Sequence, residues 1–366
     1  MRKNQPPYAL ILLGNGFDIA HDFKTTYANF MDYLLEYTRN NNFACKASHL
    51  GYYIRKDKNG EDPYIAISNI GSPRKVKLVV KPYGARSVFF SYLFNCFDQT
   101  NTWGDFEESY FRCLDEHKGH DKETINLKGI TLVNKEFEHF KELFKAYLIE
   151  QENENNEEVN KEILEKKGIS ELLSQKINKH EYVEIISFNY TSKIVKLMRE
   201  EMVSKMSPFE KDGKSIPANE RIKISHIHGE LNSEDNPIIF GYGNDRSEKF
   251  KKLLQYENDE LMKYMKTFLY KQNTVNDHIN YCLGKGKTKV IVLGHSLSDS
   301  DSTLLNKIFK HTNVIEIELM YHQSKEKYMK KLYQFARIVN DQTIVDEKVL
   351  PIDQTRVVNK EAQPSL

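Results

Sequence analysis

His228 is the residue whose type and position best suit general-base chemistry. Its imidazole titrates near neutral pH, and the next residue, Gly229, lets the backbone approach a ligand closely. Histidines are more often structural than catalytic, but His228 comes where a predicted strand ends, which favours a catalytic role. His226 lies two residues earlier on the same strand face, as in some metal sites. Because no Cys or carboxylate motif completes such a site, we predict no metal here.

A glycine turn near the start of the chain could hold a nucleotide phosphate. Gly14, Asn15 and Gly16 follow the first apolar run and precede a segment that could become a helix. In such a turn the glycines allow close approach, and free backbone N–H groups point at the ligand's charge. We therefore expect these residues and Phe17 to bind a cofactor. Asp18 would repel a phosphate, so a sugar hydroxyl, a water or the cap of the first helix suits it better.

Similar polar motifs follow four other apolar runs. Ligands of an open α/β sheet bind outside the carboxyl ends of its strands, so we expect all five motifs to meet at one edge. The glycines could instead be simple turns, Asn189 could cap a helix, and Asp299 or Asp301 could cap another. Beyond the first turn, the cofactor-binding candidates are Thr191, Gly241, Gly294, His295, Ser296 and Asp299.

The elements that would position these motifs alternate between strands and helices. Apolar runs predict strands at residues 8–13, 183–188, 222–227, 237–240, 289–293 and 314–319. Apolar residues at helical spacing predict helices at 25–38, 87–116, 134–150, 192–203, 247–272, 301–310 and 324–336. This alternation predicts an α/β fold with a Rossmann-like, mainly parallel sheet flanked by helices.

A segment of different character follows the first helix. Asn59-Gly60, a strong hairpin turn signal, lies between two apolar runs, and Lys77–Val80 could add a strand. We predict a single α/β domain over 1–366, with a β-hairpin and a helical subdomain inserted at 45–180.

Within that insertion, the stretch 151–167 is almost entirely charged or amide, which predicts an exposed helix or connector and not a site. Trp103 is expected to pack in the helical subdomain, and Glu107 is a weaker site candidate.

The composition excludes several classes of protein. The 366 residues are 39% hydrophobic and 29% charged, as in a soluble globular protein, and the net charge of +1 indicates no global field for nucleic acid. The four cysteines form no CxxC pair, which indicates free thiols in a reducing cytosol. No apolar window approaches the roughly 18 residues of a membrane span. We expect a cytoplasmic protein without membrane association.

The motifs, in their order along the chain, resemble those of a known family. LLGNGFDIAHDFKTTY at 12–27, WGDFE at 103–107, SFNYT at 187–191, HIHG at 226–229, IFGYG at 239–243 and GHSLSDSD at 294–301 are similar to the AbiH abortive-infection family of bacterial anti-phage proteins. The resemblance extends from residue 8 to about 310. It implies a defence effector, and it leaves open a phage-derived trigger and a homo-oligomeric state.

That family resembles, more distantly, the sirtuin-like NAD-binding fold. Asn189 matches the catalytic asparagine of that fold and His228 its catalytic histidine. The resemblance implies that the histidine serves as base, while the asparagine orients water or ribose near the bond to nicotinamide. The glycine-rich opening and late loops are matched by Gly14, Gly16, Gly294 and Ser296.

The chain also departs from the sirtuin pattern. Asp18 stands where sirtuins usually have serine, and Thr191 stands where an aspartate normally contacts the nicotinamide amide. The zinc module with paired cysteines is missing. These departures argue against protein deacylation but not against nucleotide binding.

The leading interpretation is an anti-phage effector that binds NAD and hydrolyses it to nicotinamide and ADP-ribose. The glycine turn would hold the pyrophosphate, Asn189 would position water at the anomeric carbon, and His228 would act as general base or orient a ribose hydroxyl. Positive charge builds on the ribose as the glycosidic bond breaks, and Asp18 is the candidate carboxylate to stabilise it. Two alternatives stay open: a metal-dependent nuclease using Asp18, Asp299 and Asp301, and a non-catalytic nucleotide-sensing module.

Overall fold

The chain folds into two compact units. The structure, a computed structural model, describes residues 6–39, 65–69, 76–80, 88–96, 103–121, 123–154, 157–272, 274–322 and 324–355. Unit 1 comprises Met1–Lys24, Glu152–Ile239 and Tyr270–Leu366, and unit 2 comprises Thr25–Gln151 and Phe240–Leu269, so the chain passes between them four times. The predicted single domain with an insertion at 45–180 stays a prediction.

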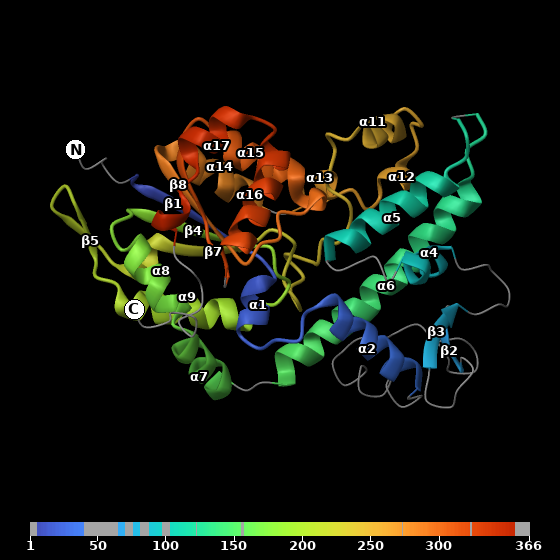
Figure 1. Ribbon diagram of the computed structural model, residues 1–366, viewed down its shortest axis with the longest axis horizontal. Helices are drawn as coiled ribbons and strands as arrows, with labels where there is room; N and C mark the ends of the chain where they lie inside the picture. The colour runs from blue at the N-terminus through green and yellow to red at the C-terminus, as the bar shows by residue number, and fades with distance from the viewer. Residues whose placement is uncertain are drawn as a thin grey trace. The chain divides into compact units, whose positions relative to one another are not determined.

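Unit 1 is built on a five-stranded parallel sheet (Figure 1). Its order is β7-β4-β1-β8-β9, so β1 lies at the centre, where the strand order reverses. Ligands of open α/β sheets bind at such a reversal, outside the carboxyl ends of the strands. The predicted mainly parallel α/β fold is confirmed. The strands are β1 (Tyr8–Leu13), β4 (Tyr182–Ser187), β7 (Ile222–His226), β8 (Thr288–Leu293) and β9 (Val314–Leu319).

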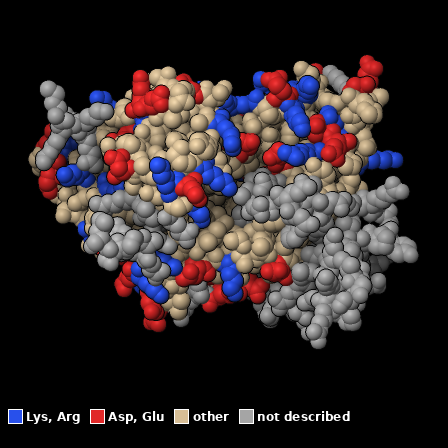
Figure 2. All heavy atoms as spheres, viewed as in Figure 1, with Lys and Arg blue, Asp and Glu red and all other residues tan. Residues whose placement is uncertain are grey.

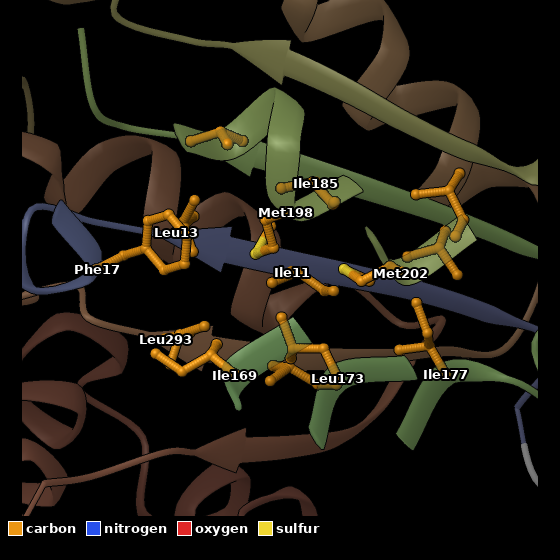
Figure 3. Packing of buried hydrophobic residues seen from close by; sticks show 14 of the residues in the cluster. Ile11, Leu13, Phe17, Ile169, Leu173, Ile177, Ile185, Met198, Met202 and Leu293 are labelled. Carbon is orange, nitrogen blue, oxygen red and sulfur yellow. The ribbon is translucent and has the colours of Figure 1, made fainter. Parts of the chain in front are cut away.

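Helices cover both faces of this sheet (Figure 1). Alternate residues of β1 point to opposite faces: Ile11 and Leu13 pack toward α8 (Ile169–Ile177) and α9 (Lys193–Lys205), as Figure 3 shows. The other face contacts α14 (Val275–Lys285). A strand buried on both faces must be apolar throughout, which explains the unbroken run of apolar residues in β1.

The remaining elements of unit 1 are short or lie toward the edges of the sheet. One of them, the β5–β6 hairpin, was not predicted, although its Asp212-Gly213 turn, with φ of 50° and 75°, carries a recognised hairpin signal. These elements are α1 (Gly16–Ala20), α7 (Glu157–Lys167), β5 (Phe209–Lys211), β6 (Lys214–Ile216), α10 (Ala218–Arg221), α15 (Ser302–Lys310), α16 (Lys325–Val339) and α17 (Gln342–Lys348).

Unit 2 is mainly helical and encloses an aromatic core. Phe137 stacks on Tyr110 with ring centroids 3.9 Å apart, and Phe140 packs near both Phe30 and Phe240. Its elements are α2 (Tyr27–Arg39), β2 (Ile65–Asn69), β3 (Val76–Val80), α4 (Phe89–Cys96), α5 (Trp103–His117), α6 (Leu127–Glu154, which ends in unit 1), α11 (Glu248–Leu254), α12 (Asp259–Met262) and α13 (Lys266–Leu269).

The inserted hairpin is confirmed, since β2 and β3 pair antiparallel, with Ile65 opposite Val80. β3 is the strand that Lys77–Val80 was expected to add, whereas the turn predicted at Asn59-Gly60 comes before β2 and lies outside the described residues. The side chain of Trp103, which begins α5, lies outside them as well.

Two predicted elements are wrong. Residues 237–240 form no strand: Pro237 has no N–H to donate, and Ile239 makes a single main-chain bond, to the His228 carbonyl. Residues 247–272 form three short helices instead of one, because Glu257 adopts a positive φ of 51° and Asn258 caps a new helix.

Candidate functional site

Four strands of unit 1 end in register. Leu13 of β1 pairs with Ser187 of β4 and Leu293 of β8, and Ser187 pairs with His226 of β7. The segments that follow these strands therefore start at one edge of the sheet. The structure thus brings together four of the five predicted motifs.

The Asp18 side chain joins two other predicted site residues, Asn189 and Thr191. Its carboxylate accepts hydrogen bonds from Asn189 Nδ2 at 2.7 Å and from Thr191 Oγ1 at 2.5 Å, one to each oxygen. Asp18 is only 1% exposed. Burial raises its pKa to about 7, against the lowering effect of these two hydrogen bonds, and the nearby Glu152 adds to the rise. Asp18 orients its neighbours, because both of its oxygens are already bonded within the protein.

Asn189 has one end of its amide bonded and the other unpaired. A carboxylate only accepts, so the amide nitrogen faces Asp18, and Oδ1 has no hydrogen-bond partner among the described residues. Asn189 is 4% exposed. A buried acceptor without a partner costs roughly 1–3 kcal/mol. The unpaired oxygen therefore marks a position where a ligand or a water would be stabilised.

His228 is held at both ring nitrogens. Nδ1 donates to the Phe188 carbonyl at 3.0 Å, and Nε2 lies 3.0 Å from both Asp301 Oδ1 and the Tyr270 hydroxyl. The ring faces an acceptor on each side, so it donates to both only when it carries two protons. His228 is 5% exposed. The interpretation of His228 as a base facing a substrate is therefore not supported by its surroundings.

Asp301 and Tyr270 are neighbours of His228 that the sequence did not connect with it. The sequence predicts Asp301 as a helix cap or as a carboxylate of the alternative nuclease site, yet its side chain makes no cap hydrogen bond to α15 and instead faces His228. Tyr270 carried no signal, because it lies 42 residues from His228 in the sequence.

The glycine turn packs against the loop that follows β8. The N–H of Gly16 donates to the Gly294 carbonyl at 2.8 Å, that of Phe17 to Gly14, and that of Gly14 to Leu293. A Cβ on Gly16 would lie 2.7 Å from the Gly294 oxygen, so the packing itself requires glycine. The expectation that these three N–H groups are free to point at a phosphate is therefore wrong for this conformation.

Gly241 belongs to unit 2 and not to this edge of the unit 1 sheet. Its N–H donates to Glu107 Oε1, and a Cβ there would lie 2.0 Å from the Tyr264 carbonyl oxygen. Glu107 also forms a buried ion pair with Lys266, at 2.8 Å. Close packing within unit 2 accounts for both Gly241 and Glu107.

The motif after β8 divides between buried and exposed residues. His295 is buried, accepts a hydrogen bond from the Leu297 N–H at Nδ1, and places Nε2 3.7 Å from Asp301 Oδ2. Ser296 and Asp299 are exposed. Among the cofactor-binding candidates of this motif, His295 is the residue that the structure places beside Asp301, the partner of His228.

Glu152, which raises the pKa of Asp18, is another residue near the site that the sequence did not identify. It was placed in an exposed, charged stretch, yet it is 4% exposed. Its Oε1 accepts from the N–H groups of Ser192, at 2.5 Å, and Lys193, at 3.1 Å, at the start of α9. A helix start offers unpaired N–H groups, and a carboxylate buried there satisfies them.

The comparison with known families decides the identity of the chain. The model of the family described as "Bacteriophage abortive infection AbiH" matches residues 10–323, most of the chain. The chain belongs to the AbiH family. Its role is therefore that of the family, abortive infection of bacteriophage. No curated protein matches the chain.

The AbiH match runs from β1 to just past β9, and so contains every predicted site residue. The carboxylates that a nuclease would need do not gather in this AbiH chain: Asp18 bonds to Asn189, Asp301 faces His228, and Asp299 is exposed. Within the described ranges, no group of three or more His, Cys, Asp or Glu residues is placed to hold a metal ion.

The surface of the AbiH chain carries mixed charge. Figure 2 shows basic and acidic side chains interspersed on the face in view, which agrees with the net charge of +1. In the part of the chain that the structure describes, no helix has both the length and the apolar character needed to cross a membrane.

Proposed function

We propose that this AbiH protein binds NAD and hydrolyses it to nicotinamide and ADP-ribose during abortive infection. The observation that carries the proposal is the buried Asp18–Asn189 pair, which leaves Asn189 Oδ1 without a partner among the described residues. The pair lies outside the carboxyl end of the central strand, where open α/β sheets bind ligands. The resemblance of Asn189 to the catalytic asparagine of the sirtuin-like fold supports the choice of NAD.

Asn189 is the proposed contact to the substrate. Its unpaired oxygen accepts a hydrogen bond from a water or from a ribose hydroxyl beside the glycosidic bond. Asp18 holds the amide in this orientation, and its ionised form places negative charge near the ribose. Cleavage of the bond to nicotinamide builds positive charge on that sugar, so a fixed negative charge nearby favours the transition state.

His228 is proposed to position the segment that carries Asn189. Its Nδ1 donates to the carbonyl of Phe188, the residue just before Asn189, and its Nε2 lies against the Asp301 carboxylate. The ring thereby connects the ends of β4 and β7 to the loop after β8. The N–H groups of Gly14, Gly16 and Phe17 are excluded from the proposed contacts, since they are bonded to carbonyls.

The test is release of nicotinamide from NAD by the purified protein, with and without EDTA, beside Asn189→Ala. We expect release by the wild type that EDTA leaves unchanged, and a loss of roughly a hundredfold in kcat for the variant, as for other groups that act in the transition state. Asn219→Ala, at an exposed residue of α10, is the matched control and should keep full activity.

Three other results would contradict the proposal. A wild type that neither binds NAD by calorimetry nor releases nicotinamide would refute the substrate. Cleavage of nucleic acid that stops with EDTA would favour the nuclease. Tight NAD binding without turnover would favour the nucleotide-sensing module.

A further inference from the structure

His226, the last residue of β7, has one ring nitrogen bonded and the other unpaired. Nδ1 donates to the backbone carbonyl of Asn189 at 3.2 Å, whereas Nε2 has no hydrogen-bond partner among the described residues. His226 is 5% exposed. The bond to Asn189 fixes the tautomer: in the neutral ring the proton is on Nδ1, and Nε2 carries the lone pair.

The surroundings of His226 keep its ring neutral. Burial lowers its pKa below the ordinary value of 6.5, and the charged groups that act on it are Glu230, which raises the pKa, and Lys196, which lowers it. These two residues form an ion pair with each other, so their effects on the ring oppose. At physiological pH the lone pair on Nε2 is therefore available to accept a proton.

His228 differs from His226 in this respect. Both of its nitrogens have partners, at the Phe188 carbonyl and at Asp301 with Tyr270. A histidine that takes a proton from a substrate or a water needs an unoccupied lone pair. Of these two histidines at the end of β7, His226 is the one that meets this requirement.

Two unpaired acceptors thus stand on neighbouring strand ends. Asn189 Oδ1 follows β4, His226 Nε2 ends β7, and the bond from His226 Nδ1 to the Asn189 carbonyl joins the two residues directly. A water carries two O–H donors, so it can satisfy two acceptors at once. We propose that Asn189 Oδ1 and His226 Nε2 bind the attacking water and that His226, not His228, is the general base.

The inference rests on the proposed function, and its chemistry balances. The water oxygen forms a bond to the anomeric carbon of the ribose while the bond from that carbon to the nicotinamide nitrogen breaks. The electron pair of the broken bond neutralises the positive ring nitrogen, and nicotinamide leaves. The proton of the water goes to His226 Nε2, and the resulting imidazolium releases it to solvent.

The decisive variant is His226→Asn. The asparagine amide can still donate to the Asn189 carbonyl in place of Nδ1, but it has no atom at the position of Nε2. His180→Asn is the matched control, because His180 is also buried with a pKa lowered to about 4, but it lies before β4, at the other end of that strand.

We expect His226→Asn to lower kcat for nicotinamide release by about a hundredfold or more, as for loss of a general base. Its Kd for NAD should change by less than about threefold, since binding does not need the lone pair. His180→Asn should keep the kcat of the wild type. In the wild type the rate should fall at acid pH as His226 gains a proton, and His226→Gln should lose this part of the pH profile.

A second measurement does not depend on turnover. In nitrogen NMR spectra, the histidine resonance that is absent from His226→Asn should report an unprotonated Nε2 and should shift when NAD or ADP-ribose is added. A protonated Nε2, or a resonance that does not move with bound ligand, would overturn the inference.

The failures of the two proposals are distinguishable. Nicotinamide release by the wild type together with an unchanged kcat in His226→Asn would overturn the role of His226 and leave the proposed function intact. A wild type that neither binds NAD nor releases nicotinamide would overturn both.

Discussion

At the scale of single residues, the site is defined by which buried side-chain polar atoms have hydrogen-bond partners and which do not. Both carboxylate oxygens of Asp18 accept hydrogen bonds, from Asn189 and Thr191, and both ring nitrogens of His228 have hydrogen-bond partners. Asn189 and His226 each retain one buried polar atom without a partner among the described residues. Because an unpaired buried polar atom is unfavourable, these two residues are the candidates for ligand contact.

Asp18 makes stability depend on pH. Its pKa is about 7 in the folded protein against 3.8 ordinarily, so the folded state keeps a proton that the unfolded chain releases between these values. The folded state binds more protons in this window, so stability falls as pH rises from 3.8 to about 7. At about 1.4 kcal/mol per pH unit, the loss is on the order of 4 kcal/mol.

We expect Asp18→Asn, which stays neutral, to gain stability relative to the wild type as pH rises. The free energy of unfolding of the variant, relative to that of the wild type, should be higher at pH 8 than at pH 5 by roughly 3 kcal/mol. Urea unfolding at both pH values measures it, with the exposed Asp299→Asn as control. An equal difference at both pH values would contradict the raised pKa of Asp18.

At the scale of elements, two loops hold the central strands together beyond their ends. The Gly14–Gly16 turn after β1 and the Gly294 loop after β8 exchange main-chain contacts that leave no room for a side chain. Gly294 also adopts a φ of +67°, which non-glycine residues rarely tolerate. The glycines that resemble a phosphate cradle therefore have a packing role.

Substitution of Gly294 tests this role. A Cβ there would lie 2.5 Å from the Phe17 nitrogen, so we expect Gly294→Ala to destabilise the protein by roughly 2–4 kcal/mol. Gly284→Ala in α14 is the control: nothing lies within 4 Å of its added carbon, and alanine should stabilise the helix by up to about 1 kcal/mol. Similar effects of both substitutions on chemical denaturation would contradict the packing role.

At the scale of the whole molecule, all four passages of the chain between its units adjoin the candidate site in unit 1. The N–H of Phe23 donates to the Asp18 carbonyl just before the first passage, and Glu152 caps α9 just after the second. Ile239 bonds to the His228 carbonyl, and the Tyr270 hydroxyl to the His228 ring. The residues of unit 1 at which the chain leaves and re-enters this unit therefore take part in the hydrogen bonds around the site.

The core of unit 2 includes the buried Glu107–Lys266 ion pair, whose side chains are 5% and 0% exposed. Glu107→Gln leaves the buried ammonium facing a neutral amide, and we expect a loss of roughly 3–5 kcal/mol. Glu107→Gln combined with Lys266→Met should recover most of this loss. Since each unit has its own core, calorimetry should resolve two transitions, of which Glu107→Gln shifts one. A single transition that shifts as a whole would contradict independent cores.

The sequence by itself determined the five parallel strands of unit 1 to within one or two residues. β1 is apolar along its whole length because it is buried on both faces, and the other four strands are short runs rich in Val, Ile and Leu, a pattern that neighbouring residues alone reveal. The alternation of strands with helices then determined that the motifs after β1, β4, β7 and β8 meet at one edge. Asp18 and Asn189 were placed together on this reasoning.

Only the tertiary structure decided how these side chains pair. Asp18 and Asn189 are 171 residues apart in the chain, and His228 and Asp301 are 73 apart, so no local pattern encodes their hydrogen bonds. The raised pKa of Asp18 and the unpaired Nε2 of His226 follow from burial, which depends on the completed fold. The periodicity that predicts strands and helices depends on residues a few positions apart, whereas the hydrogen bonds of the site join residues that only folding brings into contact.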